Sequence, residues 1–132
     1  PDTLQQAYIR PRNYDVLLYG INLGADPDVY AYWHSSQASD PGLNLSGYAS
    51  PMADKALEGA RVTSDQTMRA AKYGTFLAAW ASDTPAIMLY APDYIYAVNA
   101  DVSGIVAKKL VNPADRFYGV EQWTVRTKTA RR

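Results

Sequence analysis

Two stretches of apolar residues at helical spacing constrain the fold of this 132-residue chain most. In residues 51–62, apolar side chains recur three or four positions apart, directly after a Ser-Pro pair that is typical of a helix start. A second helix, expected to begin at Ser64 or Asp65, has a broader stripe and is predicted to be the main core helix. The stripes are Ala53, Ala56, Leu57 and Ala60 in the first helix, and Met68, Tyr73, Phe76, Leu77 and Trp80 in the second.

Short apolar runs before and after these helices predict β-strands. Residues 14–19, YDVLLY, have a continuous apolar centre, which is typical of a strand covered on both faces. Residues 86–91 and 94–98 are too short for helices, and 117–125 are expected to form a final strand. The order strand, helix, helix, strand, strand predicts an α/β fold in which helices cover a sheet.

A short polar loop follows the first predicted strand. Gly20 to Gly24 includes Asn22, and these residues tolerate unusual backbone angles and close approach of a ligand. Asp26 and Pro27 are expected to cap and begin the next helix. Because ligands of open α/β sheets bind just beyond the carboxyl ends of strands, this loop is predicted to contact a ligand.

Composition and charge exclude several classes of function. No run approaches the roughly 18 consecutive apolar residues of a membrane span. Residues 1–125 carry nine basic and 13 acidic side chains, a net charge of about −4, which argues against nucleic acid as a partner. Four basic residues crowd 126–132, which we interpret as a solvated basic tail, whereas 35–50 is predicted to be a surface loop.

No pattern typical of a catalytic or metal site occurs in the sequence. His34 is the only histidine, and neighbours in sequence such as Ser35 and Ser36 rarely place a hydroxyl and an imidazole in attack geometry. Helix capping explains Asp26 and Asp28, and the absence of cysteine removes thiolate ligands. We therefore predict no catalytic residue, no metal site and no cofactor.

The chain resembles the extracellular solute-binding proteins of family 5, the peptide- and nickel-binding receptors of bacterial ABC importers. The resemblance is carried in order by YDVLLYGINLGADPDVYAYWHS, by GLNLSGYASPMADKALEGAR, by a helix with Arg69, Tyr73 and Trp80, and by DTPAIMLYAPDYIYAVNADVSGI. It implies that residues 1–125 are a C-terminal lobe segment of a two-lobed receptor, followed by the basic tail at 126–132. The implied fold is a periplasmic-binding-protein type II-like lobe, with a mixed sheet packed by helices.

The same resemblance implies a function in transport. Such a receptor captures an extracytoplasmic solute, here a peptide or a peptide-like molecule, and delivers it to a membrane ABC permease without catalysis. It is implied to lie in the periplasm, or to be a lipoprotein anchored to the outer face of the cell membrane. The alternative is a non-transport module that uses the same fold to sense a ligand.

The resemblance also bears on the ligand. Peptide-binding members place an aspartate in the loop after the first strand, where it pairs with the amino terminus of the peptide. By alignment the counterpart here is Leu23, which offers a buried ammonium neither charge nor a hydrogen bond. The ligand therefore stays open among a peptide held another way, an oligosaccharide and a metal chelate.

The predicted substrate-binding residues are those of the loop together with one tryptophan, namely Tyr19, Gly20, Ile21, Asn22, Leu23 and Trp33. In the alternative interpretation Tyr19 and Leu23 fill the core, and Trp33 packs against the strand. The resemblance further implies that 117–125 lacks its normal sheet partner. This exposed edge predicts a dimer of the fragment.

Overall fold

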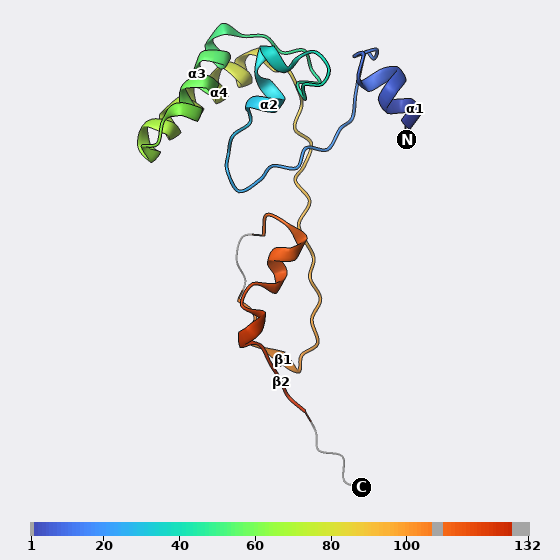
Figure 1. Ribbon diagram of the computed structural model, residues 1–132, viewed down its shortest axis with the longest axis vertical. Coiled ribbons are helices and arrows are strands. Elements are labelled where there is room, and N and C mark those ends of the chain that lie inside the picture. Colours follow the sequence, from blue (N-terminus) through green and yellow to red (C-terminus); the bar gives the residue numbers. More distant parts are fainter. Residues whose placement is uncertain (1, 107–109, 128–132) are drawn as a thin grey trace. The chain divides into compact units, whose positions relative to one another are not determined.

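The computed structural model describes residues 2–106 and 110–127, and the chain divides into two compact units, Pro1–Met88 and Leu89–Arg132. Figure 1 labels their helices and strands. Within the described ranges, no helix combines the length and the apolar character needed to cross a bilayer. Of the predicted basic tail, residues 128–132 lie outside the described residues, and the described Arg126 forms an ion pair with Asp101.

The first unit is helical, and its main feature is a hairpin of two helices. Its elements are α1 (Asp2–Leu4), a π-helical turn (Gln5–Ile9), α2 (Tyr30–Trp33), a 3-10 turn (Ser35–Gln37), α3 (Pro51–Val62) and α4 (Gln66–Asp83). Helices α3 and α4 lie side by side in Figure 1 and contact each other extensively. Both long helices are therefore confirmed, the first with the predicted bounds.

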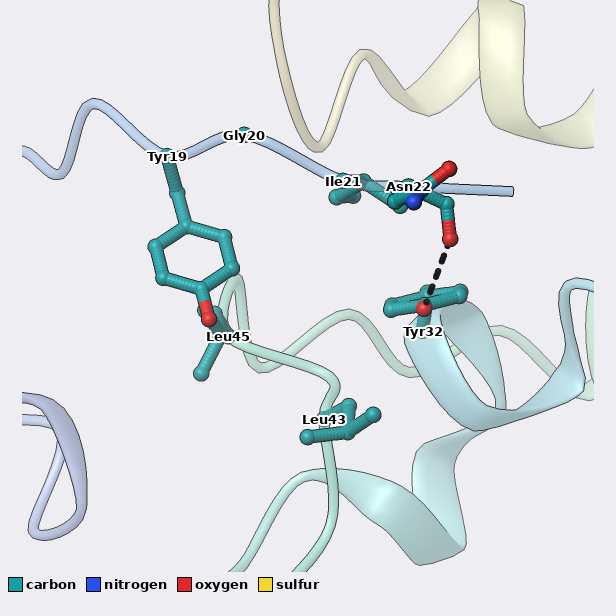
Figure 2. Close-up of a pocket in the computed structure, with 7 residues that line it drawn as sticks. All are labelled: Tyr19, Gly20, Ile21, Asn22, Tyr32, Leu43 and Leu45. Atoms are coloured by element: carbon teal, nitrogen blue, oxygen red, sulfur yellow. Dashed lines mark hydrogen bonds between the residues drawn. The ribbon is translucent and has the colours of Figure 1, made fainter. Parts of the chain in front are cut away.

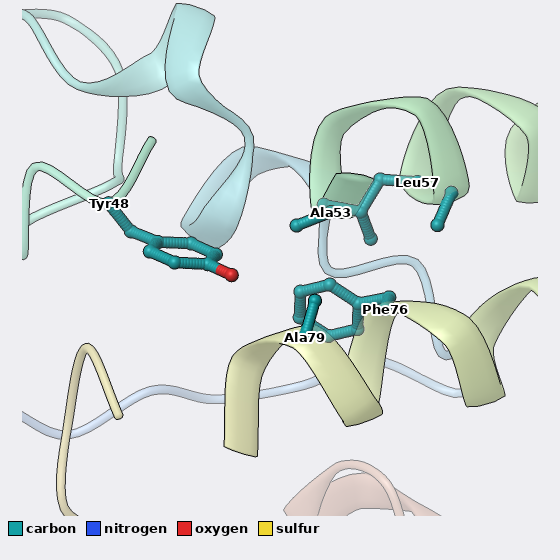
Figure 3. Packing of buried hydrophobic residues seen from close by; sticks show 6 residues of the cluster. Tyr48, Ala53, Leu57, Phe76 and Ala79 are labelled. Atoms are coloured by element: carbon teal, nitrogen blue, oxygen red, sulfur yellow. The ribbon is translucent and has the colours of Figure 1, made fainter. Parts of the chain in front are cut away.

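The core of this unit lies between α3 and α4. All four stripe residues of α3 are buried, and Leu57 has no exposed surface. From α4, Phe76 and Ala79 face them, and Tyr48 of the preceding loop closes one end, as Figure 3 shows. The alanines on α3 leave little side-chain bulk between the helix axes, which allows the close approach that such packing requires.

The stripe predicted for α4 is only partly correct. Phe76 is buried, and Tyr73 and Trp80 pack against the core as partly buried residues. Leu77 is 58% exposed and Met68 is 59% exposed, so neither belongs to the core. The narrow alanine face of α3 covers one side of α4 only, and no other described element of this unit covers the side that carries Leu77.

Asp65, rather than Ser64, caps α4, because its Oδ1 accepts a hydrogen bond from Met68 N at 2.7 Å. We expect Asp65→Ala to lower the free energy of unfolding by about 1 kcal/mol, since one amide of the first turn loses its acceptor. Ser64→Ala is the matched control and should change it by less than about 0.5 kcal/mol. Urea denaturation followed by circular dichroism checks both, and equal effects of the two substitutions would contradict this assignment.

Two predictions for residues 14–28 are wrong. The run 14–19 forms no strand, and Val16 and Leu18 are 89% and 81% exposed. A strand needs a neighbour for its amide and carbonyl groups, and no described segment pairs with this one. The helix expected at Pro27 begins at Tyr30, because Asp26 and Asp28 accept hydrogen bonds two residues on and form turns instead.

The second unit contains the only sheet of the described residues. Strand β1 (Val102–Ser103) pairs with β2 (Thr124–Val125) in antiparallel register, Val102 opposite Val125 and Ser103 opposite Thr124. Two 3-10 turns, Pro113–Phe117 and Val120–Gln122, lie between them. The final strand predicted at 117–125 is thus reduced to its last two residues, and these have a partner within the chain.

The strands predicted at 86–91 and 94–98 are absent, and both runs are irregular. Their apolar side chains are largely exposed, as in Ile87 at 79% and Ile95 at 89%. A short apolar sequence favours a strand only when a paired neighbour and a covering layer are present. The mixed sheet packed by helices is therefore not present among residues 2–106 and 110–127, and it stays a prediction for a longer lobe.

Candidate functional site

A shallow hollow of about 240 Å³ lies between the loop at 19–22, helix α2 and the loop that precedes α3. Figure 2 shows its lining, which consists of Tyr19, Gly20, Ile21, Asn22, Tyr32, Leu43 and Leu45. The Tyr32 hydroxyl donates to the Asn22 carbonyl oxygen at 3.4 Å, which ties α2 to the loop. The hollow therefore combines apolar side chains, two phenol rings and an extended stretch of backbone.

Four of the six predicted site residues line this hollow, and two do not. Leu23 is 48% exposed and lies outside the lining. Trp33 packs against the helical core, where its ring meets Trp80 edge to face with centroids 5.3 Å apart. The unusual backbone angles allowed by Gly20 and Gly24 are not used, since neither glycine has a positive φ. A Cβ at Gly20 would meet no atom within 4 Å.

Asn44 holds one wall of the hollow in place. It is fully buried, and its Nδ2 donates to the carbonyl oxygens of His34 at 3.1 Å and Tyr48 at 2.8 Å. Its Oδ1 accepts from Tyr48 N at 3.2 Å. Since Leu43 and Leu45 flank this inward-pointing amide, both leucines lie at the surface that the hollow uses.

Tyr48 connects that loop to the end of α4. Its ring belongs to the buried core, and its hydroxyl donates to Asp83 Oδ2 at 2.8 Å. Burial raises the pKa of Tyr48 above its ordinary value, so the hydroxyl stays protonated and continues to donate at neutral pH. The loop that carries Leu43 and Leu45 is thus attached at two buried points.

Two arginine–aspartate pairs attach the segment after the hollow to the helices. Arg69 of α4 pairs with Asp26 and also donates from Nε to the Ala60 carbonyl oxygen at 3.2 Å. Arg61 of α3 pairs with Asp28 at 3.0 Å. These contacts hold residues 26–28, which follow the loop of the hollow after a few positions, against α3 and α4.

The Arg69 guanidinium hydrogen-bonds to Asp26 and lowers the pKa of that carboxyl below its ordinary value of 3.8. Because the pKa is lower in the folded state, the pair stabilises the fold at pH values above the pKa of the unfolded chain. This contribution is lost as the pH falls through the pKa of the folded state. We expect Arg69→Gln to raise the pKa of Asp26 toward 3.8, measured by carboxyl-carbon NMR titration. Arg61→Gln should leave it unchanged, and an equal shift in both variants would contradict the pairing.

His34 is buried and occupied by structural contacts. Its Nδ1 accepts from Ser36 N at 3.1 Å and lies 2.8 Å from Ser36 Oγ. Its Nε2 is buried without a hydrogen-bond partner in the part of the chain that the structure describes, 3.3 Å from Glu58 Oε1 and 3.8 Å from Asp54 Oδ1, and the ring stacks on Tyr30. This arrangement links the 3-10 turn to α3. Among the described residues, no three metal-ligating side chains come together.

Sequence reasoning missed Leu43 and Leu45, which it assigned to a surface loop. The signal in LNL is a polar residue between two leucines, an alternation that turns Asn44 inward and both leucines outward. Over three residues this pattern is too short to distinguish a pocket wall from an ordinary loop.

Comparison with known proteins gives two relatives. The chain is 30% identical over 111 residues to the oligopeptide-binding protein AppA of Bacillus subtilis, which covers 84% of this chain and 20% of that protein. It is 33% identical over 93 residues to protein XP55 of Streptomyces lividans, covering 68% of this chain and 17% of that protein. The chain thus spans about a fifth of the length of these curated relatives.

No family profile and no solved structure matches the chain. The similarity to a protein that is named as oligopeptide-binding agrees with the resemblance found in the sequence.

Proposed function

We propose that this chain is a segment of an extracellular solute-binding receptor of the family 5 type, and that the complete receptor captures a peptide or peptide-like solute for an ABC importer. The observation that carries the proposal is the 30% identity to an oligopeptide-binding protein over 84% of the chain. Four loop residues predicted to touch the solute lie around one hollow, which supports it. The receptor has no catalytic role in this proposal.

The proposal also gives a reason for the exposed apolar runs. In a type II periplasmic-binding-protein lobe, residues 14–19, 86–91 and 94–98 are strands of a mixed sheet whose other strands come from the rest of the receptor. Burial of each large apolar side chain in such a sheet contributes about 1.5–3 kcal/mol. The free energy gained by burial therefore favours strands that pair within such a sheet over the exposed conformation that these runs have in the 132-residue chain.

Location and partners follow from the same proposal. The receptor acts outside the cytoplasm, free in a periplasm or anchored by a lipid, and its macromolecular partner is a membrane permease. Dimerisation of the fragment also stays a proposal, but the exposed runs now offer a longer edge for it than 117–125. Light scattering of the chain over a range of concentrations tests this, and a constant monomer mass would overturn it.

The proposed function is tested in the organism that encodes the chain. The gene that contains these 132 residues is deleted, and uptake of radiolabelled di- and oligopeptides is measured in the deletion strain and in a complemented strain. We expect uptake of at least one peptide class to fall and to return on complementation. Unchanged uptake of all of them, together with no peptide bound to the purified full protein, would overturn the proposal.

A further inference from the structure

A second hollow, of about 220 Å³, lies beside the first and shares Tyr19, Leu43 and Leu45 with it. Its remaining lining comes from the turn at the start of the chain and from the loop before α3, namely Gln5, Ile9, Arg10, Arg12, Asp40, Pro41 and Gly42. Each hollow alone is smaller than a typical small-molecule pocket of about 300–1,000 Å³. Together they reach that range.

The second hollow differs from the first in carrying two guanidinium groups. Arg12 forms no ion pair with any acidic side chain of the described residues, and its hydrogen bonds go to the carbonyl oxygens of Ile9, Arg10 and Gly42. Its Nε is covered by protein and has no acceptor. The positive charge of Arg12 is therefore offset by backbone dipoles only, and its field extends into the hollow.

The conformation of Arg12 adds to this observation. Its φ of +60° lies in the left-handed region, where glycine or asparagine is usual at the end of a helical turn. The left-handed backbone of an arginine is higher in free energy than that of a glycine. The hydrogen bond from the Arg12 side chain to the Gly42 carbonyl oxygen offsets part of this difference. The same bonds hold the guanidinium at the wall of the hollow.

Arg10 supplies a second and more accessible charge. Within the described part of the chain, its one ion pair joins Nε to Asp40 Oδ1 at 3.9 Å, and both side chains are about half exposed. A pair this long and this exposed contributes little, so a ligand carboxylate can take the place of Asp40 at a small cost. With Asp40 included, the three charged groups of this hollow sum to one positive charge.

We infer that the two hollows form one site for a solute with an apolar body and a carboxylate group. The apolar body lies among Tyr19, Leu43 and Leu45, and the carboxylate contacts Arg10 within the field of Arg12. This inference rests on the proposed function, because it names the chemistry of the solute that the receptor captures. It is also compatible with a leucine at position 23, since the recognised charge is negative and contacts Arg10.

The test compares two probes that differ only in charge, 4-phenylbutyrate and 4-phenylbutanamide. Both are titrated to millimolar concentration into the 132-residue chain at low ionic strength, and the amide signals of Gly20 and Gly42 are followed by NMR. We expect the carboxylate to bind about three- to fivefold tighter than the amide. Salt at 0.5 M should remove the difference without weakening the amide, because screening acts on the charged probe alone.

Variants assign the effect to a residue. Arg10→Gln should make the two probes bind equally. Arg126→Gln is the control, because Arg126 is also an exposed arginine that pairs with one aspartate, but it lies outside both hollows and contacts none of the segments that line them. Equal affinity of the two probes for the unaltered chain, or no shift of Gly20 and Gly42 with either, would overturn the inference. Neither result depends on peptide uptake, so the inference and the proposed function fail separately.

Discussion

Replacing Leu57 with alanine should lower the free energy of unfolding of the helical unit by about 2–5 kcal/mol. Leu57 has no exposed surface and lies between α3 and α4, opposite Phe76. Its removal forfeits the burial of the side chain and leaves a cavity that the neighbouring alanines are too small to fill. Urea denaturation followed by tryptophan fluorescence measures the change, since Trp33 and Trp80 pack against the same cluster.

Leu77→Ala is the matched control for this prediction. It deletes the same atoms from the neighbouring helix, at a position that is 58% exposed and that the periodicity of the sequence assigned to the core. The expected change is less than about 1 kcal/mol, because little apolar surface is lost. A loss for Leu77→Ala as large as that for Leu57→Ala would show that the sequence pattern, not the observed packing, describes the core.

The second large effect is expected at Asn44, where alanine should lower the free energy of unfolding by about 2–4 kcal/mol. The substitution leaves the Tyr48 carbonyl oxygen without its partner in a buried site, and it removes one of two partners from the His34 carbonyl oxygen and from the Tyr48 amide. Buried polar groups without partners lose the hydration they have in the unfolded chain and gain nothing in return. Hydrogen exchange should then accelerate first at the amide of Tyr48.

Asn22→Ala provides the comparison for Asn44→Ala. Asn22 is an exposed residue of the hollow whose side chain makes no hydrogen bond in the described structure, so its loss should change stability by less than about 0.5 kcal/mol. Asn44→Ala should also weaken binding of 4-phenylbutanamide, because the loop that carries Leu43 and Leu45 loses the hydrogen bonds that fix it. Asn22→Ala should affect binding only through the contacts that the Asn22 side chain itself makes with the probe. Similar stability of the two variants would contradict the role given to Asn44.

The helices were predictable because their signals are local. The stripe of α3, the proline at its first position and a cap for α4 at Ser64 or Asp65 each depend on residues within one or two turns of one another. The strands were not predictable to the same degree. An apolar run such as 86–91 has the composition of a strand, but strand formation depends on a partner that may come from anywhere in a longer chain.

The candidate site likewise has residues that the sequence indicated and residues that only the tertiary structure brought together. The loop from Gly20 to Gly24 was predicted to contact a ligand from its glycines and its place after an apolar run, and its first three residues line the first hollow. Trp33 was also assigned to the ligand, but it lies against Trp80. Arg12 carried no signal of a site and the alternation at Leu43 and Leu45 is too short to mark one, because what brings these residues to Tyr19 is contact between segments that are distant in sequence.

The sequence by itself therefore determined the two long helices, the start of α3 and the buried face of α3, since helix periodicity and capping act within one or two turns. Only the tertiary structure decided which side of α4 is buried, where Trp33 packs and which residues share the two hollows. These outcomes depend on how distant segments meet, and a buried amide such as Asn44 sets that meeting through hydrogen bonds that no local pattern encodes.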